Sequence, residues 1–203
     1  MFIGGVAIAE EKLHRLENLG LKDSKKLTDE RRKELGPVIA EHAAETTVKE
    51  ITASEIDELR AIMSLNAIEI RGFARVIEDL EPDAVIIDLP EPNAETFGKK
   101  LQAAVDETVG TIDITAEHEA DDTYPIVSGA SILAKNAREA HVNELHEKYD
   151  RDFASGYPHD TPTIEFLEDY CEKHGHLPPE TRTSWSTAQR IKEQHEQASI
   201  DSF

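Results

Sequence analysis

The sequence has one cysteine, one tryptophan and few aromatic side chains, and it contains no long apolar run. The lone Cys171 excludes an internal disulfide and is typical of proteins of the reducing cytoplasm. A membrane span needs about eighteen consecutive apolar residues, which the chain lacks, and the opening FIGGVAIAEE is too short and too quickly acidic for a signal peptide. We therefore expect a cytoplasmic protein with no membrane segment, and 203 residues are enough for one sizeable hydrophobic core.

Basic residues are also scarce, because 22 Lys and Arg stand against 42 Asp and Glu, which gives a net charge of −20. Nucleic-acid-binding proteins usually present basic surfaces. A surplus of surface acid keeps a protein in solution, as in halophilic proteins, and a cation-binding or acidic-partner role for the bulk charge is the alternative. The charge does not exclude a polyanionic substrate, provided that cations gather locally or metal ions mediate the contact.

Hydrophobic periodicity predicts strands that alternate with helices along the chain. Strands are expected at 2–9, 46–52, 83–88 and 110–117. Helices are expected at 10–20, after an N-cap at Thr28, at 64–80, 95–107 and 124–149, and in two further segments before a polar tail. This order predicts an α/β fold around one mixed sheet, in which ligands bind beyond the carboxyl ends of the strands.

The stretch HEADDTYPIVSGASILAKNAR, residues 118–138, places two adjacent acids, Asp121 and Asp122, before the longest predicted helix. On a helical wheel, one face is expected to pack on the sheet and comprises Ile126, Ala130, Leu133, Ala137 and Ala140. Another face carries hydroxyls and cations, from Ser128, Ser131, Lys135 and Arg138. The acids could cap the helix, or they could join Asp88, which ends a buried strand, in a metal and phosphate site. The pattern alone leaves both interpretations open.

Four strings then occur in an order and spacing that resemble the archaeal branch of ribonuclease HII: KDSKKLT (22–28), EHEADDTYPIVSGASILAK (117–135), SGYPHD (155–160) and HGHLPPETRTSW (174–185). The resemblance implies an endonuclease that cleaves the RNA strand of RNA–DNA hybrids and cuts at ribonucleotides embedded in duplex DNA. It implies a two-metal mechanism with Mg²⁺ or Mn²⁺. The implied fold is a ribonuclease H-like mixed central sheet flanked by helices, with a core at 1–150, a substrate-binding helical extension at 151–196 and a flexible tail at 197–203.

The resemblance also assigns roles to individual residues of this sequence. Asp88 and Asp121 match the family's catalytic, metal-binding aspartates. Tyr157 matches the residue that senses the junction between ribose and deoxyribose, although it could also be an aromatic side chain packed at a Gly-Tyr-Pro turn. Three cations are implied as contacts to the nucleic-acid backbone, namely Lys25, Lys135 and Arg138.

The chain departs from the family pattern at its start, because the string Asp-Glu-Ala-Gly-Arg-Gly of the family's first strand is absent. That strand would supply two of four expected carboxylates. We expect a start upstream of Met1 that restores it, and weak or no activity for the 203 residues alone. The alternatives are a non-catalytic truncated relative that binds hybrid duplexes or the sliding clamp, and an acidic α/β protein with no nucleic-acid role.

The last residues, QASIDSF, contain Gln197, Ile200 and Phe203. Their spacing resembles the peptide that partner enzymes insert into the sliding clamp of replication. A single helical turn would place Ile200 and Phe203 on one side as apolar anchors, while Gln197 would bind at the rim of the groove. The alternative is a frayed terminus. We expect a monomer.

Overall fold

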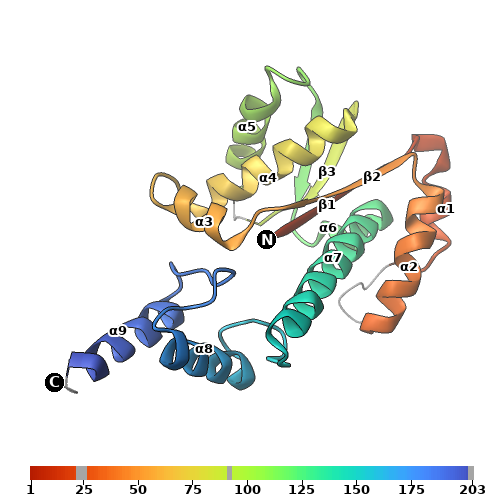
Figure 1. Cartoon of the computed structure of the whole chain (residues 1–203). Coiled ribbons are helices and arrows are strands. Elements are labelled where there is room, and N and C mark those ends of the chain that lie inside the picture. The colour runs from red at the N-terminus through yellow and green to blue at the C-terminus, as the bar shows by residue number, and fades with distance from the viewer. Residues whose placement is uncertain (22–26, 91–92, 201–203) are drawn as a thin grey trace. The chain divides into compact units, whose positions relative to one another are not determined.

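The computed structural model describes residues 1–21, 27–90 and 93–200, and the chain forms two compact units (Figure 1). The first unit contains Met1–Glu50 and Leu65–Arg138, and the second contains Ile51–Ser64 and Glu139–Phe203. The division falls inside helix α7 (Pro125–Tyr149), earlier than the boundary at residue 150 that the sequence suggested. A short segment from the first half of the chain also joins the second unit.

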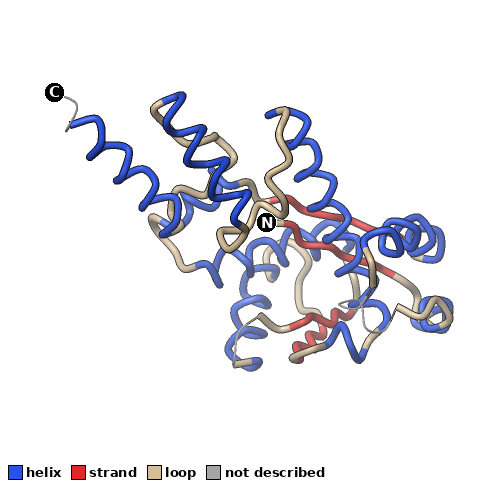
Figure 2. The backbone as a smooth tube through the Cα atoms, turned by 90° about the horizontal axis from the view of Figure 1, so that it is seen from below, coloured by secondary structure: helices blue, strands red, loops and turns tan. Residues whose placement is uncertain are grey.

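The strands of the first unit form two pairs within the described ranges, shown in red in Figure 2. Strand β1 (Phe2–Ala7) pairs antiparallel with β2 (Glu45–Glu50), and β3 (Ala84–Asp88) pairs parallel with β4 (Asp113–Glu117). The predicted α/β class, with strands of both orientations and flanking helices, is confirmed. The pairings make two two-stranded sheets in the described residues, since β1 bonds to β2 and β3 bonds to β4.

The helices of the first unit follow the predicted order with one exception. Thr28 caps α2 (Asp29–His42), because its hydroxyl accepts the backbone N–H of Arg31 at 3.2 Å, as predicted. The helix expected at 10–20 is broken into a 3₁₀ turn, η1 (Glu10–Lys12), and a single turn, α1 (His14–Glu17). Such a short segment gains too few backbone hydrogen bonds to offset helix nucleation. The remaining helices are α4 (Leu65–Leu80), α5 (Ala94–Val105), α6 (Ala120–Thr123) and the first part of α7.

Helix α4 and the crossover helix α5 cover the parallel strand pair with a shared apolar core. A parallel pair needs a long connection between its strands, and the segment that contains α5 supplies it. The buried side chains of this core come from α4, α5, β3 and the residues next to β3 and β4, and comprise Ile70, Ala74, Ile77, Ile87, Leu89, Phe97, Leu101, Val105 and Ile112. This core fixes β3, and therefore the position of the residue that ends it.

Two adjacent glycines of β1 allow helices to contact the strand closely on both faces. A Cβ atom on Gly4 would lie 2.3 Å from the carbonyl oxygen of Ala130 in α7, and one on Gly5 would lie 2.4 Å from Cγ1 of Val76 in α4. Successive strand residues face opposite sides, so the two glycines face different helices. Each packing therefore requires the absence of a side chain.

We expect Gly4→Ala to destabilise the protein, because the added methyl group would meet rigid backbone of α7. Overpacking of this kind costs about 1–3 kcal/mol, which corresponds to a fall in Tm of roughly 2–12 °C for a chain of this size. The control is Gly98→Ala in α5, where an added Cβ has nothing within 4 Å and alanine favours the helix. Thermal unfolding of both variants tests the packing, and an unchanged Tm for Gly4→Ala would contradict it.

Helix α7 is buried on more than the one predicted face. The predicted face makes contacts, because Ala130 meets β1 and both Ile126 and Leu133 pack on an apolar cluster. The buried residues of α7 are Val127, Ser128, Gly129 and Ile132, whereas Ala140 of the predicted apolar face is exposed. The reason is that α7 packs on more than one side, since β1 meets it at Ala130 and α2 meets it at Gly129 through the side chain of Ile39. Although α7 is long, neither it nor another helix in the described ranges is long and apolar enough to cross a membrane.

The second unit is helical, as predicted for the region after residue 160. It contains α3 (Ala53–Arg60), the end of α7, α8 (Thr161–His174) and α9 (Ser186–Ile200). Its core comprises Phe153, Phe166, Leu167, Cys171 and Ile191. Burial raises the pKa of the Cys171 thiol, which agrees with an inert structural cysteine. Helix α9 continues to Ile200, so the segment expected as a tail begins inside a helix.

The carboxylate of Asp57 explains why the segment 51–64 belongs to the second unit. It accepts hydrogen bonds from the backbone N–H and the hydroxyl of both Thr183 and Ser184, at 2.6–3.3 Å. Burial alone would raise the pKa of Asp57, but the bonds from Ser184 and Thr183 outweigh it and lower the pKa below its usual value. The ionised carboxylate thus attaches α3 to the segment that precedes α9.

Candidate active site

Asp88 ends β3 and faces away from the core. Its neighbours Ile87 and Leu89 are only 4% and 6% exposed and pack under α4 and α5. Side chains alternate along a strand, so the Asp88 carboxylate is turned outward, and the residue is exposed. Because β3 and β4 are parallel, their carboxyl ends meet at one edge, which is where open α/β sheets bind ligands.

The chain that leaves β4 returns directly to Asp88. Glu119 adopts a left-handed conformation, with φ of 54°, and starts the short helix α6. The backbone N–H of Ala120 then donates to Oδ1 of Asp88 at 3.2 Å. Asp121 is the next residue. This hydrogen bond therefore places Asp88 and Asp121, which the sequence singled out separately, on adjoining segments at the strand ends.

The two adjacent acids of α6 have different environments. Asp121 is only 2% exposed, whereas Asp122 is exposed. A carboxylate is buried at such a site only with hydrogen-bond donors or a cation beside it, since removing it from water is costly. The sequence could not distinguish the two acids, and the structure separates an inward-facing carboxylate from a solvated one.

Glu117 is a further acid at this edge that the sequence interpretation missed. It ends β4 in register with Asp88, and its carboxylate accepts the hydroxyl of Tyr124 at 3.2 Å. Burial, and then the charge of Glu117, raise the pKa of the Tyr124 phenol. The backbone carbonyl of Tyr124 accepts the N–H groups of Val127 and Ser128, so Glu117 connects the strand end to the first turn of α7. Its position as the last residue of a predicted strand was the available signal.

Asp88 and Asp121 are donors of the type that Mg²⁺ and Mn²⁺ prefer. Among the described residues, no group of three or more His, Cys, Asp or Glu side chains is arranged to hold a metal ion. Mg²⁺ keeps several waters and binds through one or two carboxylates together with substrate oxygens. The donor set therefore fits an ion held by two carboxylates, with water and substrate completing its shell.

The predicted face of hydroxyls and cations on α7 is only partly available. The hydroxyl of Ser128 is fully buried and donates to the carbonyl oxygen of Leu21, so this side chain anchors α7 and cannot contact a phosphate. Lys135 and Arg138 are half-buried on the part of α7 that belongs to the first unit. Lys25 lies outside the described residues.

The other predicted residues lie in the second unit or at its end. Tyr157 is 42% exposed. Gln197 is exposed on α9, and Ile200 is the last residue of that helix. Phe203 lies outside the described residues.

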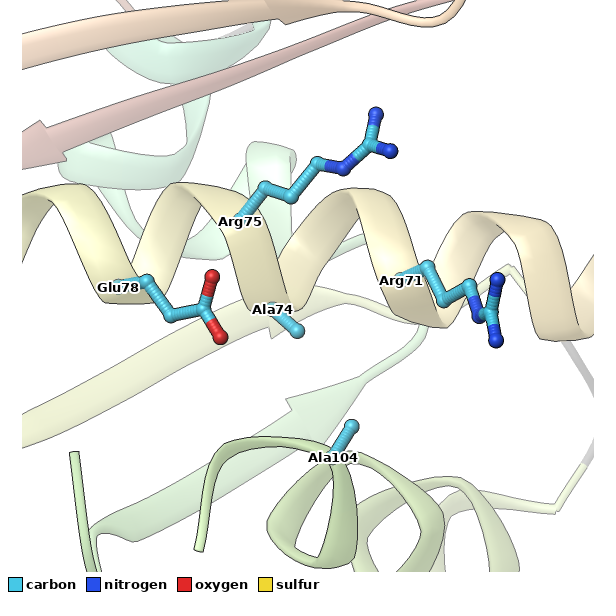
Figure 3. A pocket seen from close by; sticks show the side chains of 5 residues that line it. All are labelled: Arg71, Ala74, Arg75, Glu78 and Ala104. Carbon is cyan, nitrogen blue, oxygen red and sulfur yellow. The ribbon is translucent and has the colours of Figure 1, made fainter. Parts of the chain in front are cut away.

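A shallow hollow between α4 and α5 does not coincide with these acids (Figure 3). It is lined by Arg71, Ala74, Arg75, Glu78 and Ala104. Arg71 and Arg75 point in different directions from α4, and Glu78 adds a negative charge. The hollow therefore lacks the convergent groups of a binding site.

The model of the family Ribonuclease HII matches residues 1–188. The chain belongs to the ribonuclease HII family. It is 42% identical over 199 residues to ribonuclease HII of Methanosarcina barkeri. The matched region covers 96% of this chain and 89% of that protein. The resemblance carried by the four sequence strings is confirmed.

Solved structures of ribonuclease HII share the fold. The ribonuclease H2 of Pyrococcus horikoshii OT3 superposes with a TM-score of 0.86 at 32% identity, over 97% of this chain and 99% of the other. The ribonuclease HII of Archaeoglobus fulgidus, solved in a complex with PCNA, gives a TM-score of 0.82 at 34% identity. The superposition covers 94% of this chain and 88% of the other. The ribonuclease H-like fold predicted for the chain is therefore confirmed.

We expect Asp88→Asn and Asp88→Ala to separate two roles of this residue. Asparagine keeps an oxygen for the Ala120 N–H but loses the charge, so divalent-ion affinity should fall about tenfold or more while Tm is nearly unchanged. Alanine also loses the hydrogen bond, which should lower the free energy of unfolding by about 0.5–2 kcal/mol. Calorimetric titration with Mn²⁺ and thermal unfolding measure the two effects. Asp83→Asn, an exposed acid before the same strand, is the control, and unchanged Mn²⁺ affinity in Asp88→Asn would refute the assignment.

Proposed function

We propose that this chain is an endonuclease that cleaves the RNA strand of RNA–DNA hybrids and nicks duplex DNA at embedded ribonucleotides. The observation that carries the proposal is the hydrogen bond from Ala120 to Asp88, since it joins the segments of Asp88 and Asp121 at the carboxyl ends of two parallel strands in a ribonuclease HII fold. Hydrolysis of a phosphodiester requires oxygen ligands of this kind beside the scissile phosphate.

The roles of the residues follow from their chemistry. Asp88 and Asp121 would hold Mg²⁺ or Mn²⁺, which when bound supplies an activated water and stabilises the departing oxygen. Asp88 can act in this way while also accepting the Ala120 N–H, because a carboxylate has two oxygens. The buried Asp121 has little freedom to change position, which favours a fixed geometry at the phosphate.

Lys135 and Arg138 are proposed to hold the nucleic-acid backbone. They lie on α7, which begins four residues after Asp121, so they place positive charge in the unit that carries the acids. In a chain of net charge −20 these local cations, together with the metal ion, offset the repulsion of phosphates. Tyr157 is proposed to contact the sugar at the ribose–deoxyribose junction, where the 2′-hydroxyl distinguishes RNA from DNA.

The test is cleavage of a duplex that carries one ribonucleotide, with Mg²⁺ or Mn²⁺ and with EDTA. We expect nicking that requires the divalent ion, and Asp121→Asn should reduce it by about two orders of magnitude or more. Asp122→Asn is the matched control, because this neighbour is exposed and should keep the wild-type rate. Wild-type nicking by Asp121→Asn, or nicking in EDTA, would overturn the proposal.

A second candidate function is binding of hybrid duplexes without cleavage. It is favoured by the finding that, in the described part of the chain, no group of three or more His, Cys, Asp or Glu side chains is arranged to hold a metal ion. Tight binding of the hybrid with no nicking at any Mn²⁺ concentration would support this candidate over the first.

We also propose that the C-terminal segment binds the sliding clamp. Gln197 is exposed on α9, and one of the structural neighbours is a ribonuclease HII solved with PCNA. The spacing Gln197, Ile200 and Phe203 supplies a polar rim contact and two apolar anchors.

Phe203→Ala should abolish binding to the cognate clamp, because the variant loses an apolar anchor from a short peptide with few others. We expect a wild-type Kd in the range of roughly 1 μM, measured by calorimetry. Gln194→Ala is the control, since Gln194 lies on the same helix and contacts Arg190 instead. Equal clamp binding by wild type and Phe203→Ala would end the idea.

A further inference from the structure

The loop from Ser155 to Asp160 holds the backbone of Tyr157 in a closed turn. One oxygen of the Asp160 carboxylate, Oδ2, accepts the backbone N–H of Ser155 at 3.2 Å and the Ser155 hydroxyl. The N–H of Tyr157 donates to that same hydroxyl oxygen at 3.3 Å, and the N–H of Asp160 donates to the carbonyl oxygen of Tyr157 at 3.1 Å. Gly156 has a φ of +74°, which a residue with a side chain rarely adopts. The backbone is thus fixed on both sides of Tyr157.

The ring of Tyr157 is held by a different residue, His159. Their ring centroids are 5.5 Å apart and the planes are inclined by only 14°, which is an offset stack. The side chain of His159 is 75% exposed, so this contact is not a by-product of core packing. The pair presents two aromatic rings at the surface of the second unit.

His159 also faces the carboxylate that closes the loop. Its Nε2 lies 3.5 Å from Oδ1 of Asp160, the oxygen that Ser155 does not use. In the part of the chain that the structure describes, the titratable groups in contact with this imidazole are the Asp160 carboxylate and the Tyr157 phenol. The imidazole therefore lies between the Tyr157 ring and the Asp160 carboxylate.

We propose that His159 is a positioning residue that orients the Tyr157 ring for the ribose–deoxyribose junction. The inference rests on the role given to Tyr157 in the proposed function and adds to it. The stack contacts the Tyr157 ring directly, and the approach of His159 to Asp160 places the imidazole beside the carboxylate that closes the loop. Recognition of the 2′-hydroxyl would therefore depend on a residue that is assigned no contact with the reacting phosphate.

The experiment measures how strongly the 203-residue chain prefers a short duplex with one ribonucleotide over the same duplex made of DNA alone. Both are titrated in EDTA, so that neither is cut. His159→Ala removes the stack and should lower this preference about three- to tenfold. His159→Phe keeps an aromatic ring and should restore it. His174→Ala is the matched control, because the His174 ring also packs on an aromatic ring, with its centroid 4.2 Å from that of Tyr170. This variant should leave the preference unchanged.

Proton NMR provides a readout without substrate, since Tyr157→Ala should shift the imidazole protons of His159 and leave those of His174 in place.

The outcomes separate this proposal from the one on which it rests. If Tyr157→Ala keeps the full preference, the assignment of Tyr157 is wrong and the role of His159 is lost with it. If Tyr157→Ala loses the preference but His159→Ala keeps it, only the role of His159 is overturned. Equal losses in His159→Phe and His159→Ala would also overturn it, because the stack would then contribute nothing.

Discussion

Helix α7 lies against β1 because the strand has no side chain where the two meet. Gly4 brings the strand into contact with the backbone of α7 at Ala130, and on the other face Gly5 lets the side chain of Val76 in α4 contact the strand. These contacts fix the distance of α7 from the strand that α4 covers. Since the turn with Asp121 leads directly into α7, the position of the acid depends on glycines far away in the sequence.

The same arrangement explains how an acidic protein can present a site for a polyanion. The excess negative charge is distributed over the surface, whereas Asp121 is buried and Asp88 accepts a backbone N–H. Acids in such environments are held in place, and they differ from solvated neighbours such as Asp122. Net charge describes solubility and long-range repulsion, but it does not determine what a local cluster of fixed ligands and cations can bind.

Features encoded by a few neighbouring residues could be predicted from the sequence. The strands, the Thr28 cap and the place of Asp88 at the end of a strand follow from alternation and capping within short segments. The roles of Ser128 and Asp57 could not be predicted, because their partners Leu21 and Thr183 are more than a hundred residues away. A hydroxyl on a polar helical face has the same sequence pattern whether it meets a phosphate or a buried carbonyl.

The Ala120–Asp88 hydrogen bond also links stability to function at the site. Asp88 is a candidate metal ligand, and it also accepts the hydrogen bond that holds the turn carrying Asp121, the second candidate ligand. A carboxylate that already accepts one N–H is oriented before an ion arrives, so less conformational freedom is lost on binding. The left-handed Glu119 that permits this turn is a strained conformation for a residue with a side chain. Strain at the turn and order at the acids are therefore two consequences of one requirement, that the chain reverse direction immediately after β4 and bring Asp121 beside the end of β3.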